Sequence, residues 1–531
     1  MKKLALGVAV SAILFNDVVR ADAPLDANGL PEIFRYATQE IFLTATDSAV
    51  PLIETLLVSS DSRTKICDTF QPIYKFTNNY NQVAYYCTQN SSNPALDGGY
   101  GLLLYLKNTF NNNGIVSIIG DTDTQFLGLY NYTAICTGLT AAPVIGSLNE
   151  IRCQYNTVDP AQYRLEKPDF AISDVDPIQF RGDNKMAMGG GVFYEVTEAD
   201  LAKLTVKAVA AQVFGIAVST NLRDAMQQAQ FGATSLNVGK DTVAAMPSLT
   251  QEQVSSLLTG RITSWKQIRL STTKNLFDAS TAPYKASSDR VHICRRTSGS
   301  GTQAQVGIKF MGYPCSGTTG VGLPVPPGTD IPTPLAETVN QAQVHVNSSA
   351  RALGECLHEL GMGTNDQSPY NFNNIYAGTT RWAIGFQSTD NNANKSQEYR
   401  YIKINGHAPT LANVGLGKYI AWVEPTFVYN NSHIFKRSSF LLKEKFLVIN
   451  ELMRKLGEPS VLASVNTVNS FHEWGRSGFL ATPQLYNPAA TGVVDEVRPV
   501  NPYSHGANLT NTNNCRMPIY YPSAGTGIQY K

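Results

Sequence analysis

A strand that ends in two arginines, followed by a Ser/Gly-rich turn and a helix, is the feature that most constrains the fold. Residues 290–294 alternate as a strand does, and residues 303–311 have the pattern of a helix. The turn between them, residues 295–302, has the sequence RRTSGSGT. Strands that alternate with helices along a chain predict an α/β fold with largely parallel or mixed sheets.

The turn contains residue types that bind a tetrahedral oxyanion. N–H groups at a helix start point outward and carry partial positive charge, and glycine lets the backbone come close to a ligand. Ser300 and Thr302 add hydroxyl donors, and an arginine can form a bidentate fork. An ordinary capped helix, with the arginines in salt bridges, explains the same residues about as well.

Two further predicted strands end in polar residues. Residues 41–43 run into a small-residue turn that holds Ser48 and Ala49, and a helical pattern follows over 50–59. Residues 170–172 end at Asp174, whose carboxylate can accept a hydrogen bond from a protonated oxyanion and would reject sulfate. Taken alone, each set of residues is also typical of a helix cap or a turn.

Other segments place these motifs in a larger architecture. The small, apolar stretch 203–218 predicts one buried strand, suited to a sheet centre or to a crossing between lobes. Residues 249–260 predict a helix with a capping box, and residues 419–429 predict a single strand. Beyond residue 480 the Pro/Asn-rich chain predicts an extended tail.

The N-terminus has the pattern of a secretory signal peptide, residues 1–21. Two lysines precede an apolar stretch, and cleavage is expected after Ala21. No later apolar run reaches the roughly 18 residues needed to span a bilayer. The formal charge of +1 gives no support to nucleic-acid binding. We therefore expect export to the periplasm, the medium or the cell surface.

Eight cysteines in an exported chain favour disulfides. Pairing of sequence neighbours would give Cys67–Cys87, Cys136–Cys153 and Cys294–Cys315, and would leave Cys356 and Cys515. The absence of CxxC and the scattered histidines argue against a zinc site, so no metal or cofactor is expected. The chain also lacks GxSxG, HExxH and GxxxxGK[ST], and we do not expect an enzyme.

Together these segments resemble the periplasmic phosphate-binding protein of the phosphate-specific ABC transporter, most closely its large exported relatives. Residues 170–174 (FAISD) resemble that family's GASD strand end, and residues 295–302 resemble its RRxDGSGT loop. Residues 249–265 and 381–386 resemble its GKIxxW turn and GAIGY strand. The resemblance covers roughly residues 36–450.

The resemblance implies two α/β lobes of the type II binding-protein fold, joined by a hinge that closes on phosphate. The first lobe would comprise residues 22–205 and 389–480, and the second lobe residues 206–388. A tail would follow over residues 481–531. An ABC transporter permease would be the partner. The implied ligand-binding residues are Ser48, Ala49, Asp174, Arg296, Ser300, Gly301 and Thr302.

Two departures from the family pattern bear on the ligand. Ser298 replaces the usual aspartate of the loop, so the arginine loses a charge partner. Phe110, Asn111 and Asn112 stand where the family has a Gly/Ser-rich turn, so one serine contact does not transfer. These departures imply weaker phosphate affinity than in the transporter component, or changed selectivity. A surface or assembly protein that uses the fold with a degraded pocket is an alternative, supported by the long insertions, the Tyr/Asn-rich loops, the cysteines and the tail.

Overall fold

The computed structural model describes most of the chain. The described residues are 24–34, 38–46, 48–58, 65–78, 82–96, 99–109, 113–154, 159–160, 162–189, 191–315, 341–365, 378–434, 440–483, 496–506, 512–521 and 529–530. The predicted signal peptide and residues 110–112 lie outside them.

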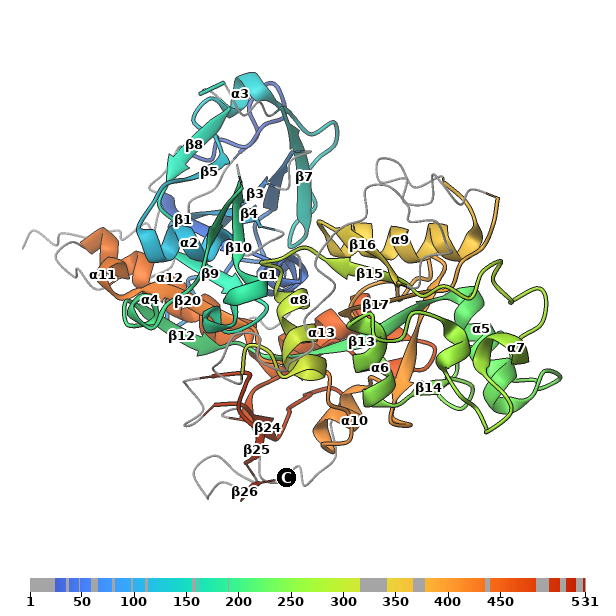
Figure 1. Cartoon of the computed structure of the whole chain (residues 1–531). Helices are drawn as coiled ribbons and strands as arrows, with labels where there is room; N and C mark the ends of the chain where they lie inside the picture. Colours follow the sequence, from blue (N-terminus) through green and yellow to red (C-terminus); the bar gives the residue numbers. More distant parts are fainter. Residues whose placement is uncertain are drawn as a thin grey trace, which may run out of the picture.

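The first lobe is built on a nine-stranded mixed sheet (Figure 1). Its strands in spatial order are β12 (Leu204–Ala208), β20 (Thr426–Asn430), β9 (Phe170–Ser173), β1 (Thr38–Ala45), β4 (Gly101–Asn108), β3 (Gln82–Thr88), β2 (Ile73–Thr77), β7 (Leu148–Cys153) and β6 (Cys136–Thr137). Successive side chains of β1 point to opposite faces, as strand geometry requires. Ile41 and Leu43 face one core and Phe42 faces another, so both faces of the sheet are covered.

Helices cover both faces of this sheet. The core beside Ile41 and Leu43 includes residues of α1 (Ala49–Val58), α12 (Phe440–Leu456) and α13 (Pro459–Asn469). The shorter elements of this lobe are α2 (Asn113–Gly120), β5 (Thr124–Leu127), α3 (Tyr132–Ile135), β8 (Tyr163–Glu166), η1 (Pro177–Gln179), η2 (Gly182–Asn184), β10 (Met186–Gly189), β11 (Val192–Tyr194), α4 (Glu198–Leu201) and α11 (Asn431–Ile434).

The second lobe is built on an eight-stranded sheet. Its path is β14 (Ser248–Leu249), β18 (Tyr399–Ile404), β13 (Ala211–Ser219), β17 (Ala383–Ser388), β15 (His292–Arg296) and β16 (Gln343–Asn347), while β19 (Trp422–Val423) and β23 (Phe479–Leu480) also pair with β13. Its helices are α5 (Thr220–Phe231), α6 (Gln251–Leu258), η3 (Trp265–Gln267), α7 (Leu276–Ala279), α8 (Gly301–Val306), the π-helix η4 (Gly307–Met311), α9 (Ala350–Met362) and α10 (Leu411–Gly415). Because β18 belongs to this sheet, the second sheet extends past residue 388.

The chain crosses between the two sheets at points where we expected uninterrupted strands. The predicted strand 203–218 is two strands, β12 in the first sheet and β13 in the second. The predicted strand 419–429 is likewise β19 and β20, separated by Glu424 and Pro425. Proline has no N–H to donate to a sheet ladder, which suits it to the break between the two strands.

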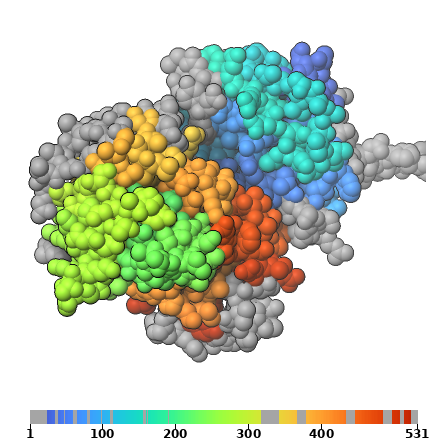
Figure 2. Space-filling model, turned by 90° about the vertical axis from the view of Figure 1, so that its right-hand side faces the viewer, coloured from blue at the N-terminus to red at the C-terminus, as the bar shows by residue number. Residues whose placement is uncertain are grey.

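The two lobes share a continuous apolar core. Ala171 and Val428 of the first sheet belong to the same buried cluster as Val213 and Ile293 of the second. Figure 2 shows the two lobes side by side, with the first lobe in blue and cyan and the second in green and yellow. The lobes are therefore packed against each other as well as linked by crossing strands.

Four disulfides connect all eight cysteines. Cys67–Cys87 and Cys136–Cys153 confirm two predicted pairs. The predicted pair Cys294–Cys315 is wrong, because Cys294 bonds Cys356 and Cys315 bonds Cys515. Strand β15 and helix α9 are packed together, which brings Cys294 and Cys356 within bonding distance although 62 residues separate them.

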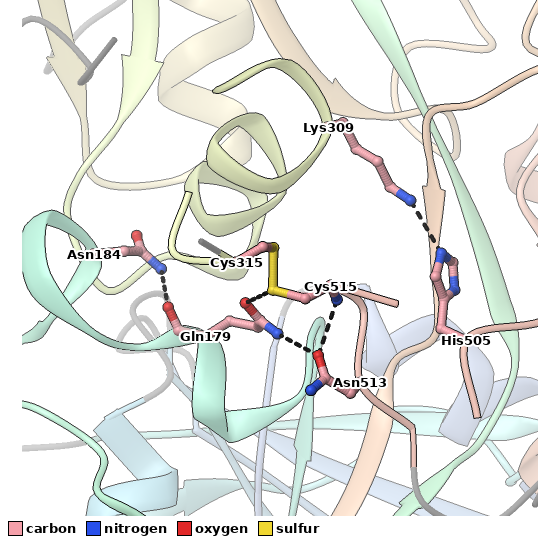
Figure 3. Close-up of a disulfide and its surroundings, with 7 residues drawn as sticks. All are labelled: Gln179, Asn184, Lys309, Cys315, His505, Asn513 and Cys515. Carbon is pink, nitrogen blue, oxygen red and sulfur yellow. Dashed lines mark hydrogen bonds between the residues drawn. A yellow bond between two sulfur atoms is a disulfide. The ribbon is translucent and has the colours of Figure 1, made fainter. Parts of the chain in front are cut away.

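The tail is fastened to both lobes, as Figure 3 shows. Cys515 bonds Cys315, which follows η4 of the second lobe. The Gln179 side-chain amide of the first lobe donates to Asn513 Oδ1 over 3.3 Å. The described parts of the tail include β24 (Tyr503–Ser504), β25 (Ile519–Tyr520) and β26 (Gln529–Tyr530). The segment around Cys515 is therefore tied to both lobes.

Candidate functional site

The carboxyl ends of two parallel strands place three polar side chains together in the first lobe. β1 and β9 are parallel neighbours, with Ala45 opposite Ile172. Residues that follow the two strands therefore meet at one edge of the sheet. Ser48 Oγ donates to Asp174 Oδ1 over 2.8 Å, and Thr46 Oγ lies 3.2 Å from Ser48 Oγ. Asp174 is thus held by hydroxyls from the turn before α1.

In the second lobe, the carboxyl end of strand β15 carries Arg296. β15 is parallel to both β16 and β17, and Arg296 lies opposite Asn347. The Arg296 guanidinium donates from Nε to Asn347 O over 3.3 Å and from Nη2 to Ser348 O over 2.9 Å. These carbonyls fix the direction of the side chain, which is only 4% exposed. Arg296 is therefore a buried, pre-oriented cation at the strand end.

Both edges line one cavity of about 160 Å³. That volume can hold a few water molecules or one small oxyanion. The lining residues are Thr46, Ser48, Pro51, Asp174, Phe214, Arg296, Thr302, Ala350, Ser388, Asp390, Asn391 and Asn469. The cavity is therefore polar and formed by both lobes.

The surroundings of Asp174 act on its ionisation in opposite directions. Burial raises the pKa of this carboxyl, while hydrogen bonds from Thr46 and Ser48 and the charge of Arg296 act in the opposite direction. The net effect is a pKa above the ordinary range for aspartate. The hydroxyls of Thr46 and Ser48 and the charge of Arg296 therefore favour the ionised carboxylate, against the effect of burial.

The start of α8 lies directly against Asp174. A Cβ atom placed on Gly301 would be 2.5 Å from Asp174 Cβ and 2.9 Å from its Oδ2, so only glycine fits there. The first N–H groups of a helix have no partner within the helix. The contact between Gly301 and Asp174 therefore brings these N–H donors close to the carboxyl. A turn of four residues separates α8 from β15, so the helix start also lies near the end of that strand.

Four of the seven predicted ligand-binding residues, Ser48, Asp174, Arg296 and Thr302, line the cavity. Gly301 is not a lining residue but packs on Asp174. Ser300 Oγ is buried and has no hydrogen-bond partner among the described residues. Ala49 is buried, and its N–H donates to Thr46 O over 3.1 Å. This N–H group is therefore already hydrogen-bonded within the protein.

Several lining residues were missed by the sequence analysis. Thr46 precedes Ser48 by two positions, and Ser388, Asp390 and Asn391 come at or just after the end of β17. The signal for the last three was present, because residues 381–386 were predicted as a strand. Strand ends in one parallel sheet share an edge, so these residues lie beside Arg296 once β17 is known to be the neighbour of β15.

Ser298 has a different role from the aspartate that it replaces. Its Oγ lies 2.9 Å from Asp183 O and 2.6 Å from Lys185 O, both carbonyl acceptors of the first lobe. The turn before α8 is thereby tied to the segment around η2. The substitution exchanges a charged group for a contact between lobes.

Comparison with known proteins gives only distant likenesses. No family model matches the chain, and no curated protein matches it. Among solved structures, a protein from Clostridium perfringens assigned as a phosphate ABC transporter substrate-binding protein, with bound phosphate, shares 10% identity at a TM-score of 0.36. The match covers 80% of this chain and 97% of that one.

Two further structural matches are of the same kind. An ABC-type phosphate transport receptor from Vibrio cholerae shares 12% identity at a TM-score of 0.33, over 78% of this chain and 96% of that one. PstS from Borrelia burgdorferi shares 10% identity at a TM-score of 0.31, over 80% and 97%. These structural neighbours are of the family that the sequence motifs resemble. At such TM-scores the likeness carries no argument about the site, which rests on its own geometry.

No helix among the described residues has the length and apolar character needed to cross a membrane. In the same part of the chain, no group of three or more His, Cys, Asp or Glu side chains is arranged to hold a metal ion.

Proposed function

We propose that this protein is an exported solute-binding protein that takes phosphate or a similar tetrahedral oxyanion between its two lobes. The observation that carries the proposal is the meeting of Asp174, Arg296 and Thr302 in one polar cavity. These side chains come from both lobes and from positions up to 128 residues apart, from 174 to 302.

Each side chain has a distinct part in the proposed binding. The Arg296 guanidinium supplies charge and directional donors, Thr302 supplies a hydroxyl donor, and Ser48 orients the Asp174 carboxylate. The first N–H groups of α8 add donors with partial positive charge. Asp174 accepts a hydrogen bond from a protonated ligand oxygen, and it opposes sulfate, which has no proton to offer.

We propose that the protein is located outside the cytoplasm. Four disulfides suit an oxidising compartment, and the predicted signal peptide would send the chain there. Mass spectrometry of protein from the producing cells should find a mature N-terminus at Asp22, after cleavage at Ala21. In transport, the protein would deliver the bound anion to an ABC transporter permease. We propose that it binds the anion and does not catalyse a reaction.

Isothermal titration calorimetry of the ligand-free protein with phosphate, arsenate and sulfate tests this function. We expect binding of phosphate and arsenate and at least tenfold weaker binding of sulfate. Arg296→Gln should remove phosphate binding, whereas Arg261→Gln, at an exposed arginine, should leave it unchanged. Absence of heat with all three anions would overturn the proposal and favour the structural alternative with a degraded pocket.

A further inference from the structure

The cavity contains a second carboxyl group, from the lobe opposite Asp174. Asp390 lies two residues after the end of β17 and lines the same cavity. We propose that Asp390 is a specificity-determining residue that restricts the site to the monoanionic, doubly protonated form of the oxyanion, such as dihydrogen phosphate. This inference rests on the proposed function and identifies which ionic form of the ligand the site accepts.

The turn that carries Asp390 is held in place by neighbouring groups. The Asn391 side-chain amide donates to Ser388 O over 3.2 Å and to Ser388 Oγ over 2.9 Å. The Tyr401 hydroxyl donates to Ser388 O over 2.7 Å. The parallel register of β15 and β17, with Cys294 opposite Gly385, sets this turn beside Arg296. The second carboxyl is therefore part of a fixed turn and not of a loose loop.

The charge of Asp390 and the hydrogen bonds that it can accept would select the protonation state of the ligand. Among the described lining residues, the acids are Asp174 and Asp390 and the base is Arg296, a formal charge of one minus two, or −1. An ionised carboxylate only accepts hydrogen bonds. Monohydrogen phosphate has one P–OH group, so it could satisfy one carboxylate and would set an acceptor oxygen against the other. Dihydrogen phosphate has two such donors, one for each carboxylate.

Five other ionisable groups among the described residues lie in the cavity or near the turn that carries Asp390. Arg296 and Asp174 share the cavity with it, while Tyr399, Tyr401 and His472 lie near the turn. Burial raises the pKa of both tyrosines, and burial lowers the pKa of His472 to about 4. Phosphate itself loses its second proton between about pH 5.5 and pH 8.5, and comparison with Asp390→Asn isolates the contribution of Asp390.

The direct test is calorimetry with inorganic phosphate at about pH 5.5, 7 and 8.5, a range that spans the loss of the second phosphate proton. For the unaltered protein we expect affinity to fall at least tenfold across this range. Asp390→Asn replaces one acceptor by a side chain that also donates, so its affinity should fall less than threefold. Asp123→Asn, the same change at an exposed position, should follow the unaltered protein.

A second measurement uses the unaltered protein alone. At about pH 8.5 most free phosphate is the dianion, so binding of the monoanion must take up a proton. Calorimetry in buffers of different ionisation enthalpy should give an uptake close to one proton per phosphate. Uptake near zero, or an Asp390→Asn profile identical to that of the unaltered protein, would overturn the inference while leaving phosphate binding intact. Failure to bind phosphate at every pH would instead overturn the proposed function itself.

Discussion

Ser48 donates a 2.8 Å hydrogen bond to Asp174, although 126 residues separate them along the chain. The bond joins the turn before α1 to the end of β9, and it stabilises the ionised carboxylate over the neutral acid. The ionisation of Asp174 therefore depends on a residue in the turn before α1.

Replacing Ser48 by alanine tests that dependence. Ser48→Ala removes a donor to Asp174, so the pKa of the carboxyl should rise further and phosphate binding should weaken about tenfold, since a hydrogen bond to a charged group is worth about 1.5–3 kcal/mol. Calorimetry at neutral pH would measure the change. Ser396→Ala, at an exposed serine, provides the matched control. Equal affinities for the two variants would show that Ser48 has no part in binding.

The contact between Gly301 and Asp174 predicts the effect of one added methyl group. Gly301→Ala would place a Cβ 2.5 Å from Asp174 Cβ, so the two lobes must shift apart. We expect loss of phosphate binding and a decrease of about 1–3 kcal/mol in the free energy of unfolding. Urea unfolding and calorimetry measure the two effects. Gly120→Ala is the control, because its nearest neighbour would lie 3.4 Å away.

Removal of the long-range disulfide Cys315–Cys515 should lower the free energy of unfolding more than removal of the short-range disulfide Cys136–Cys153. Loop-closure entropy assigns about 5 kcal/mol to a disulfide with the 200-residue separation of Cys315–Cys515, against about 3 kcal/mol for the 17-residue separation of Cys136–Cys153. Paired Cys→Ser variants at each disulfide should be compared by urea unfolding. A smaller loss for the Cys315/Cys515 variant than for the Cys136/Cys153 variant would contradict the expectation.

Asp176 predicts how stability changes with pH. Burial raises its pKa to about 7, against a hydrogen bond from Ile178 N–H and the charges of Arg516 and Arg181. The folded form therefore binds a proton that the unfolded form has lost, so its contribution to stability is full below about pH 4 and is lost as the pH rises to about 7. The total is at most about 4 kcal/mol, from about 1.4 kcal/mol per pKa unit.

Asp176→Asn keeps the side-chain oxygen that accepts from Ile178 N–H, and it removes the titration. The free energy of unfolding of this variant should depend less on pH between about pH 4 and pH 8 than that of the unaltered protein. Urea unfolding across the range measures the difference. Parallel curves for the two proteins would refute the assignment.

Local signals in the sequence predicted much of this fold. The capping box of Thr250 and Gln253 is present at the start of α6, because its hydrogen bonds involve residues only three positions apart. The turn between β15 and α8 was likewise predicted from adjacent Ser and Gly residues. Arg296 ends a strand and Asp174 follows one, as the local pattern indicated, and both line one cavity.

Features that depend on distant residues could not be predicted in the same way. Cys294 bonds Cys356 through the packing of α9 on β15, which spacing along the chain does not encode. Asp390 enters the cavity because β17 is the parallel neighbour of β15, and this pairing joins segments about 90 residues apart. The break at Glu424 also depends on which sheet each half joins.

The Cys315–Cys515 bond has a consequence for a chain that has been cut once. Any single cleavage between these two cysteines leaves one of them on each fragment, so the fragments remain one covalent molecule. Gel electrophoresis without a reducing agent would show that molecule as a single band, and the two fragments would separate only after reduction.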